Sequence, residues 1–209
     1  MITKLTCYAT GEIDIMEARG NNYSYQMGGT NVATSSTHWG PDSTLDRAYE
    51  TTAGSPQLHG IYPTDFHTFG LEWSHDYMFT YIDSRVRQVL KLDFSKKRPL
   101  FEQGGFPPAW ANNTPIQNPW HNGTASAPFD QPFYLLLNLA VGGSNGWFQD
   151  GMAGKPWTDN SVNAKAEFWA SKPSWWPTWQ DDAQGKGTSS ALIIDSVKIW
   201  QEKGYMGCV

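Results

Sequence analysis

The chain has 209 residues, the size of one domain, and a chain of this length buries about 70% of the surface that its unfolded form exposes. Its formal net charge of −5 argues against nucleic acid or an anionic membrane surface as the partner. No apolar run approaches the length of a membrane-spanning helix, so we expect no membrane insertion.

Aromatic residues make up 14% of the chain and include 11 tryptophans. Flat apolar rings beside hydrogen-bonding groups suit the recognition of sugar rings. The alternative, which we favour for most individual tryptophans, is that large rings fill the core of a β-sandwich.

The N-terminal segment, residues 1–10, has neither an apolar signal core nor a small-residue cleavage site, so it predicts no signal peptide in this chain. Three Asn-x-Ser/Thr sequons are candidate glycosylation sites, at Asn22, Asn112 and Asn122.

Three carboxylates follow one another in Gly11-Glu12-Ile13-Asp14-Ile15-Met16-Glu17, interleaved with apolar residues. Side chains alternate along a regular strand, so Glu12 and Asp14 would share one face and Glu17 would point to the other. One extra residue, a β-bulge, would bring Glu17 to the face of the other two. The pattern therefore predicts a bulged strand with three acids on one face and apolar side chains on the other.

These acids are candidate catalytic groups. Two carboxyls about 5–5.5 Å apart are the geometry of a retaining glycosidase, with one as nucleophile and one as acid/base. A third acid would raise the pKa of a neighbour through like-charge coupling. The alternative is an exposed acidic edge strand, whose charges discourage aggregation.

The next elements are β-strands separated by irregular chain. A strand is expected near residues 32–39, followed by a polar, irregular segment over 41–63. Residues 66–90 read as a β-meander, with a tight turn at Asp83-Ser84 before a strand over 85–90. One face of its first strand would carry His67, Phe69, Leu71 and Trp73.

Residues 98–131 predict a long loop, whose Trp110 and Trp120 would either shape the end of a cleft or pack within the loop. Residues 133–141 are nearly all apolar and predict a strand buried on both faces, interrupted by Asn138, which would then need hydrogen-bond partners. A glycine-rich loop that carries Trp147 follows over 142–151, with an ordinary turn as the alternative.

The C-terminal part predicts one helix over residues 162–170, capped by Asp159 or Ser161. An aromatic cluster over 175–179, a polar linker over 181–190 and a last strand over 191–201 follow. We see no internal repeats and no second domain.

The acidic stretch resembles the Glu-x-Asp-x-x-Glu signature of glycoside hydrolase family 16, in the bulged form typical of its β-1,3-glucanases, the laminarinases. The likeness continues in family order through residues 36–41, 66–73, 128–135, 138–143 and 194–201. Residues 142–148 and 154–157 most resemble the fungal branch, which is similar to invertebrate β-1,3-glucan recognition proteins.

The resemblance implies an all-β, concanavalin A-like jelly-roll β-sandwich of two antiparallel sheets with a concave carbohydrate-binding face. Members of the family place a large part of the sandwich before the acidic strand, so we expect a domain incomplete at its N-terminus. Residues 1–10 would be a divergent start and 11–209 a partial catalytic domain. Because Cys7 lies in the divergent start, we expect Cys7 and Cys208 to be unpaired; a bridge between them would instead constrain the unfolded chain.

The implied activity is retaining endo-hydrolysis of β-1,3- or mixed β-1,3/1,4-glucans. Glu12 would be the nucleophile and Glu17 the acid/base, with Asp14 orienting Glu12. Implied substrate contacts are His38, through a hydrogen bond, Trp39, through stacking on a sugar ring, Asn138 and Trp147. His67 and Glu72 would instead be packing and surface positions.

This chemistry requires no cofactor. Many family members hold a structural calcium ion with an acid at the position of Asp195, so calcium there is an expectation. The expected partner is β-glucan polysaccharide, bound by a monomer that is extracellular or in the cell wall.

Two alternatives to a working enzyme stay open. The family includes non-catalytic β-glucan-binding proteins that have lost the catalytic acids, although both glutamates are retained here. The other alternative is an inactive, incomplete chain, because half a sandwich cannot close its core.

Overall fold

The computed structural model describes residues 7–95, 98–179 and 190–202. The chain divides by its internal contacts into two compact units. The first comprises residues 1–23 and 28–133, and the second comprises residues 24–27 and 134–209. Each unit is described by itself below. None of the helices in the described residues is long and apolar enough to cross a membrane.

The first unit begins with a short helix, α1 (Cys7–Thr10), and continues into an antiparallel sheet of three strands in the order β1-β2-β3. Its strands are β1 (Glu12–Ala18), β2 (Val32–His38) and β3 (Thr52–Pro56). The central strand, β2, is rich in the β-branched residues that suit a pleated surface. It pairs with β3 from Val32 opposite Pro56 to Ser36 opposite Thr52.

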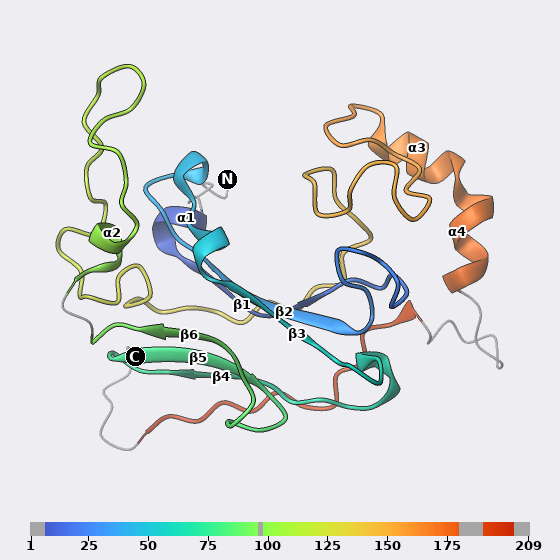
Figure 1. Ribbon diagram of the computed structural model, residues 1–209, viewed down its shortest axis with the longest axis horizontal. Helices are drawn as coiled ribbons and strands as arrows, with labels where there is room; N and C mark the ends of the chain where they lie inside the picture. The colour runs from blue at the N-terminus through green and yellow to red at the C-terminus, as the bar shows by residue number, and fades with distance from the viewer. Residues whose placement is uncertain (1–6, 96–97, 180–189, 203–209) are drawn as a thin grey trace. The chain divides into compact units, whose positions relative to one another are not determined.

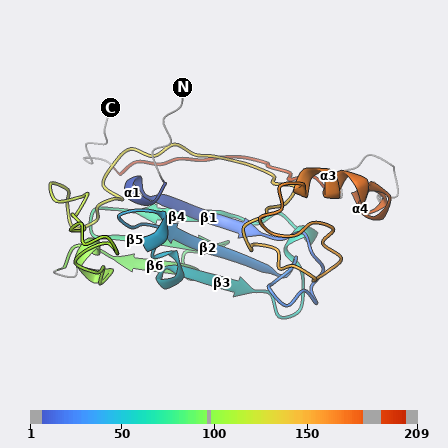
Figure 2. The same ribbon diagram turned by 90° about the horizontal axis from the view of Figure 1, so that it is seen from above.

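A second antiparallel sheet has the order β4-β5-β6, with β4 (Phe69–Trp73), β5 (Tyr77–Ile82) and β6 (Gln88–Asp93). Figure 1 shows the two sheets as separate layers, and Figure 2 shows the same strands from above. The regular secondary structure of the described residues is thus mainly β-strand in two antiparallel sheets, which confirms the predicted all-β jelly-roll sandwich.

The core of the first unit joins the two sheets and the loop that follows them. Nine buried residues form its main cluster, and the partly buried Ile13, Ala53 and Leu71 pack against it. The nine are Trp39, Met78, Leu90, Leu92, Phe94, Leu100, Trp120, Ala127 and Phe129. Trp120 also donates its indole N–H to the Ala9 carbonyl at 2.6 Å. This tryptophan therefore packs inward, as one of the two alternatives for the loop predicted.

Short helical turns connect the strands: η1 (Ser43–Leu45), η2 (Ala48–Glu50), η3 (Tyr62–Thr64) and the α-helix α2 (Leu100–Gln103). The sequence did not predict β3, because Thr52–Pro56 has no clear alternation and forms a strand through its pairing with β2. The meander is confirmed, but its last strand begins at Gln88 instead of residue 85. A backbone bond from Ile82 N to Arg87 O closes the turn there, and Asp83 adopts a positive φ of 63°.

The second unit carries the helices α3 (Ala164–Ala170) and α4 (Lys172–Trp179). The predicted helix is confirmed, but Asn163 is its N-cap and makes no side-chain capping bond. Ser161 instead donates to the Glu167 carboxylate at 2.9 Å. The aromatic cluster lies in α4, and its Trp175 stacks on Phe168 of α3 with ring centroids 4.4 Å apart.

The strand predictions for residues 133–141 and 191–201 are wrong in this structure. Both segments run without regular secondary structure, and most of their large apolar side chains are exposed. An apolar run forms a buried strand only where a neighbouring strand takes its hydrogen bonds, and none of the described strands pairs with either segment. Residues 181–189 of the expected linker lie outside the described residues. So does Cys208, and the pairing state of the cysteines stays a prediction.

Candidate functional site

The three acids of β1 are brought together by a β-bulge. Glu12 pairs with His38 and Asp14 with Ser36, and the register then shifts so that Glu17 pairs with Thr34. Two residues lie between Asp14 and Glu17, whereas only one lies between their partners Ser36 and Thr34. Residues that pair across a ladder share a face, so all three acids lie on one side of the sheet. The predicted bulge is confirmed.

The opposite side of β1 faces the interior. Ile13 packs against the main core cluster, and Met16 packs against a smaller cluster of Ala33, Tyr62 and Ile82. Inside the bulge, the hydroxyl of Ser35 donates to the Ile15 carbonyl at 2.8 Å. Ser35 is buried, so its hydroxyl satisfies a carbonyl that the interrupted ladder leaves unpaired.

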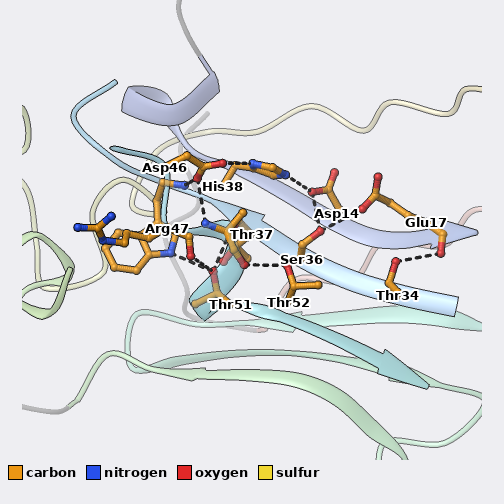
Figure 3. Close-up of polar contacts among 12 residues, drawn as sticks. Asp14, Glu17, Thr34, Ser36, Thr37, His38, Asp46, Arg47, Thr51 and Thr52 are labelled. Carbon is orange, nitrogen blue, oxygen red and sulfur yellow. Dashed lines mark hydrogen bonds and ion pairs between the residues drawn. The ribbon is translucent and has the colours of Figure 1, made fainter. Parts of the chain in front are cut away.

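Ser36 lies between two of the acids (Figure 3). Its hydroxyl oxygen is 3.2 Å from Asp14 Oδ2 and 3.1 Å from Glu17 Oε2. The two carboxyls therefore meet at one buried hydroxyl. Glu12 is exposed at the start of the strand.

His38 extends this row in the other direction. Its Nε2 is 3.5 Å from Asp14 Oδ2, and its Nδ1 is 2.6 Å from Asp46 Oδ2. The other oxygen of Asp46 accepts the backbone N–H groups of Trp39 at 3.2 Å and Ala48 at 3.0 Å. Figure 3 shows the side chains from Asp46 to Glu17 as one row along β1 and β2.

The sequence did not single out Ser36 or Asp46. Asp46 lies in a segment without periodicity, and a turn returns it to the end of β2. Asp42 opens that turn by accepting the N–H groups of Thr44 and Leu45. Gly40 is required there, because a Cβ at this position would meet the Leu45 carbonyl oxygen at 2.5 Å. An aspartate that caps a turn just after a strand is the signal that could have pointed to this fold-back.

Burial and like charge raise the pKa of Asp14 to about 6, because it is desolvated and lies near Glu17 and Glu12. His38 and the Ser36 hydroxyl partly oppose that shift. Burial alone would lower the pKa of His38, but the hydrogen bond and charge of Asp46, with the charges of Asp14 and Glu12, raise it above its ordinary value. Both groups therefore hold protons to higher pH than free side chains do.

Trp39 does not lie on the acidic face, the side of the β1-β2-β3 sheet that carries Glu12, Asp14 and Glu17. Its side chain is buried in the main core cluster, packs edge-on to Phe106, and donates its indole N–H to Thr51 Oγ1 at 3.0 Å. A ring enclosed in this way has no free face for a sugar, so the structure corrects the expected stacking role. His67 and Glu72 lie apart from the acids, as predicted: His67 contacts Asp83, and Glu72 contacts Arg85 and Tyr77.

The expected substrate residues Asn138 and Trp147 belong to the second unit, and their role in substrate binding stays a prediction. Asn138 is exposed instead of buried in a strand, and Trp147 is half-buried. The loop around Trp147 is held by Lys155, whose ammonium group contacts Asp150, Asp159 and the Phe148 carbonyl. Trp157 donates its indole N–H to the Gly143 carbonyl at 2.8 Å.

Asp195 is exposed in an irregular segment, and the described residues contain no group of three acidic, histidine or cysteine side chains that could hold a metal ion. Calcium binding at Asp195 stays a prediction. The sequon residues Asn22, Asn112 and Asn122 are all exposed, and glycosylation there stays a prediction.

Comparison with known proteins identifies relatives, most of which are named for glucan. A β-1,3-glucan-binding protein of Penaeus monodon is 37% identical over 197 residues, which cover 92% of this chain and 50% of that protein. A Gram-negative bacteria-binding protein 1 of Drosophila melanogaster is 29% identical over 200 residues, 92% of this chain and 35% of that protein. A glucan endo-1,3-beta-glucosidase of Cryptopygus antarcticus is 30% identical over 135 residues, 65% of this chain and 39% of that protein.

The chain thus spans about half the length, or less, of these relatives. Most of the relatives found are named as β-1,3-glucan-binding proteins, whereas the Cryptopygus antarcticus protein is named as a glucan endo-1,3-beta-glucosidase. No family model matches the chain, and no solved structure matches it. Placement in a fungal branch stays a prediction.

Proposed function

We propose that this chain binds β-1,3-glucan and that the acidic face of the β1-β2-β3 sheet is part of the binding site. The observation that carries the proposal is the similarity to a β-1,3-glucan-binding protein over 92% of the chain. The acidic face supports it, because Glu12, Asp14 and His38 offer partly accessible hydrogen-bonding groups in one row. Binding outside the cell is part of the same proposal and agrees with the three exposed sequons.

Hydrolysis at the same face is a second candidate, favoured by one specific observation. All three acids are present and share a face, and Asp14 and Glu17 meet at Ser36. In this reading Glu12 attacks the anomeric carbon and forms a glycosyl-enzyme, while Glu17 gives its proton to the leaving oxygen. Glu17 then takes a proton from the water that releases the sugar, so one proton is lost and regained in each turnover. Asp14 would orient Glu12.

Two assays on the 209-residue chain separate these candidates. Sedimentation with insoluble β-1,3-glucan measures binding, with a β-1,4-glucan as the control polysaccharide. Reducing ends released from laminarin measure hydrolysis. We expect wild type to sediment with the β-1,3-glucan and Glu12→Gln to abolish any release of reducing ends. Absence of binding to β-1,3-glucan would contradict the proposal.

A matched control uses a glutamate away from the acidic face. Glu102 is exposed in α2, so Glu102→Gln removes the same charge without touching the row of acids. We expect this variant to keep the wild-type binding and release. Release that persists in Glu12→Gln would rule out Glu12 as the nucleophile. Binding by wild type without any release of reducing ends would leave the chain as a binding protein.

A further inference from the structure

On the acidic face, Glu17, Ser36, Asp14 and His38 form a row of short polar contacts. When both carboxyls are ionised and His38 is neutral, the row has too few hydrogens to make every contact a hydrogen bond. A hydroxyl carries one proton, yet Ser36 Oγ lies within hydrogen-bond distance of both Asp14 Oδ2 and Glu17 Oε2. If both carboxyls are ionised, Ser36 can donate to one of them. The other contact then brings two acceptor oxygens together with no hydrogen between them. If one carboxyl is protonated, it donates to Ser36 while Ser36 donates to the other. Both contacts are then hydrogen bonds.

The histidine end of the row has the same property. Asp46 Oδ1 accepts two backbone N–H groups, and Oδ2, the other carboxylate acceptor, meets His38 Nδ1 at 2.6 Å. Nδ1 must therefore carry a hydrogen, and in neutral His38 the lone pair lies on Nε2. That lone pair faces Asp14 Oδ2, the same oxygen that contacts Ser36. A proton on Nε2 or on Asp14 makes the contact favourable.

We propose that Ser36 and Asp46 are positioning residues that distribute one shared proton along the row Glu17–Ser36–Asp14–His38. Asp46 fixes the tautomer of His38, so that Nε2 faces Asp14. Ser36 couples the protonation of Asp14 to that of Glu17. When Glu17 is protonated, it donates to Ser36 and Ser36 donates to Asp14. When the proton lies on Asp14 instead, both hydrogen bonds reverse and Ser36 donates to Glu17. The number of protons and the total charge of the row do not change.

The electrostatics of the face agree with this arrangement. The titratable groups facing Asp14 and His38 are Glu12 and Glu17 from β1 and Asp46 from the segment after β2. All are acids. Glu17 and Glu12 raise the pKa of Asp14, and Asp46 and Glu12 raise the pKa of His38, which favours a proton shared within the row. The inference rests on the second candidate function, hydrolysis, and deepens it, because it assigns the groups that set the protonation state of Glu17.

The test reads the tautomer of His38 directly, by ¹⁵N NMR of the histidine-labelled 209-residue chain. The chain has five histidines, and the His38 signals are those lost in His38→Gln. We expect neutral His38 in wild type to carry its hydrogen on Nδ1. In Asp46→Asn the amide oxygen keeps the Trp39 and Ala48 N–H groups, so its NH₂ faces Nδ1. The hydrogen should then move to Nε2, and the titration midpoint of His38 should fall.

The chain offers a matched control in a second Asp–His pair. Asp83 Oδ1 accepts the Thr68 N–H and Oδ2 meets His67 Nδ1 at 2.9 Å, away from the acidic face. Asp83→Asn should change the His67 signals and leave those of His38 unchanged. An unchanged His38 tautomer in Asp46→Asn would overturn the proposal. So would a wild-type His38 that carries its hydrogen on Nε2 or titrates as a free imidazole.

The role of Ser36 is tested by a double-mutant cycle that uses the same signal. Glu17→Gln should shift the titration midpoint of His38, and the shift should be at least twofold smaller in a Ser36→Ala background. Thr34→Ala is the control background, because Thr34 donates to the Glu17 backbone carbonyl and leaves the carboxyls untouched. Equal shifts in the two backgrounds would contradict the assignment of Ser36. Failure of glucan binding with the expected NMR result would reject the proposed function and leave this inference standing.

Discussion

Asp14 carries the clearest electrostatic cost of the acidic face. It is partly buried between two other acids, and its pKa rises to about 6 from an ordinary value of 3.8. The folded chain therefore binds this proton more tightly than the unfolded chain does. The raised pKa of His38 likewise means that folding favours its protonated form, so both groups make the fold less stable as the pH rises. The acidic face should thus destabilise the fold as the pH rises through neutrality.

Replacement of Asp14 with Asn removes the part of this effect that belongs to Asp14. In wild type, the free energy of unfolding should fall as the pH rises from about 4 to about 7, because a raised carboxyl pKa gives stability that is lost above it. The free energy of unfolding of Asp14→Asn, taken relative to wild type, should therefore be higher at pH 7 than at pH 4 by on the order of 1–3 kcal/mol. Urea unfolding at the two pH values measures the difference. The exposed Asp65→Asn is the control, and an equal effect of Asp14→Asn at both pH values would contradict the account.

The decisive element is the bulge in β1, because it sets the faces of all three acids. Its one extra residue was predictable from the spacing of acids and apolar residues, and the pairing with β2 confirms it. The partners on β2 were less predictable. Ser35 and Ser36 are adjacent and chemically identical, and the register alone sends one to the buried bulge carbonyl and the other to the acids.

Ser35→Ala tests how far the bulge depends on its buried hydrogen bond. The substitution leaves the Ile15 carbonyl without its donor in a buried position, which should cost about 1–3 kcal/mol of unfolding free energy. Chemical denaturation measures the loss. In the control, Ser174→Ala, the lost hydroxyl bonds an exposed helix carbonyl, so the change should stay within about 0.5 kcal/mol. A Ser35→Ala variant as stable as the control would show that the bulge does not need this bond.

Lys155 organises the loop that carries Trp147 in the second unit. Its side chain is 3% exposed and lies between Asp150 and Asp159. Lys155→Met would leave two carboxylates close together without their cation, so the loop should open more often. We expect faster proteolytic cleavage within residues 143–159. Lys165→Met removes an exposed lysine from α3 and should leave the cleavage rate unchanged. Equal rates in the two variants would contradict the role of Lys155.

For the whole molecule, local patterns predicted what local interactions determine. The all-β class, the acidic strand, the meander and the helix near residue 164 follow from the periodicity of apolar residues and from turn residues. The apolar segments 133–141 and 191–201 did not follow, because burial depends on partners that a local pattern does not contain. The inward position of Trp39 and the return of Asp46 to His38 are likewise tertiary effects, set by packing and by one turn.

The central claim is that the acidic face contacts β-1,3-glucan, and carboxyl footprinting tests it most directly. A carbodiimide labels exposed carboxyls, and mass spectrometry compares the labelling of Glu12 and Glu102 with and without a β-1,3-gluco-oligosaccharide. Both glutamates are exposed, and Glu102 lies away from the acidic face. We predict that the oligosaccharide protects Glu12 and leaves Glu102 unchanged. Bound oligosaccharide with equal labelling of Glu12 in its presence and absence would contradict the claim.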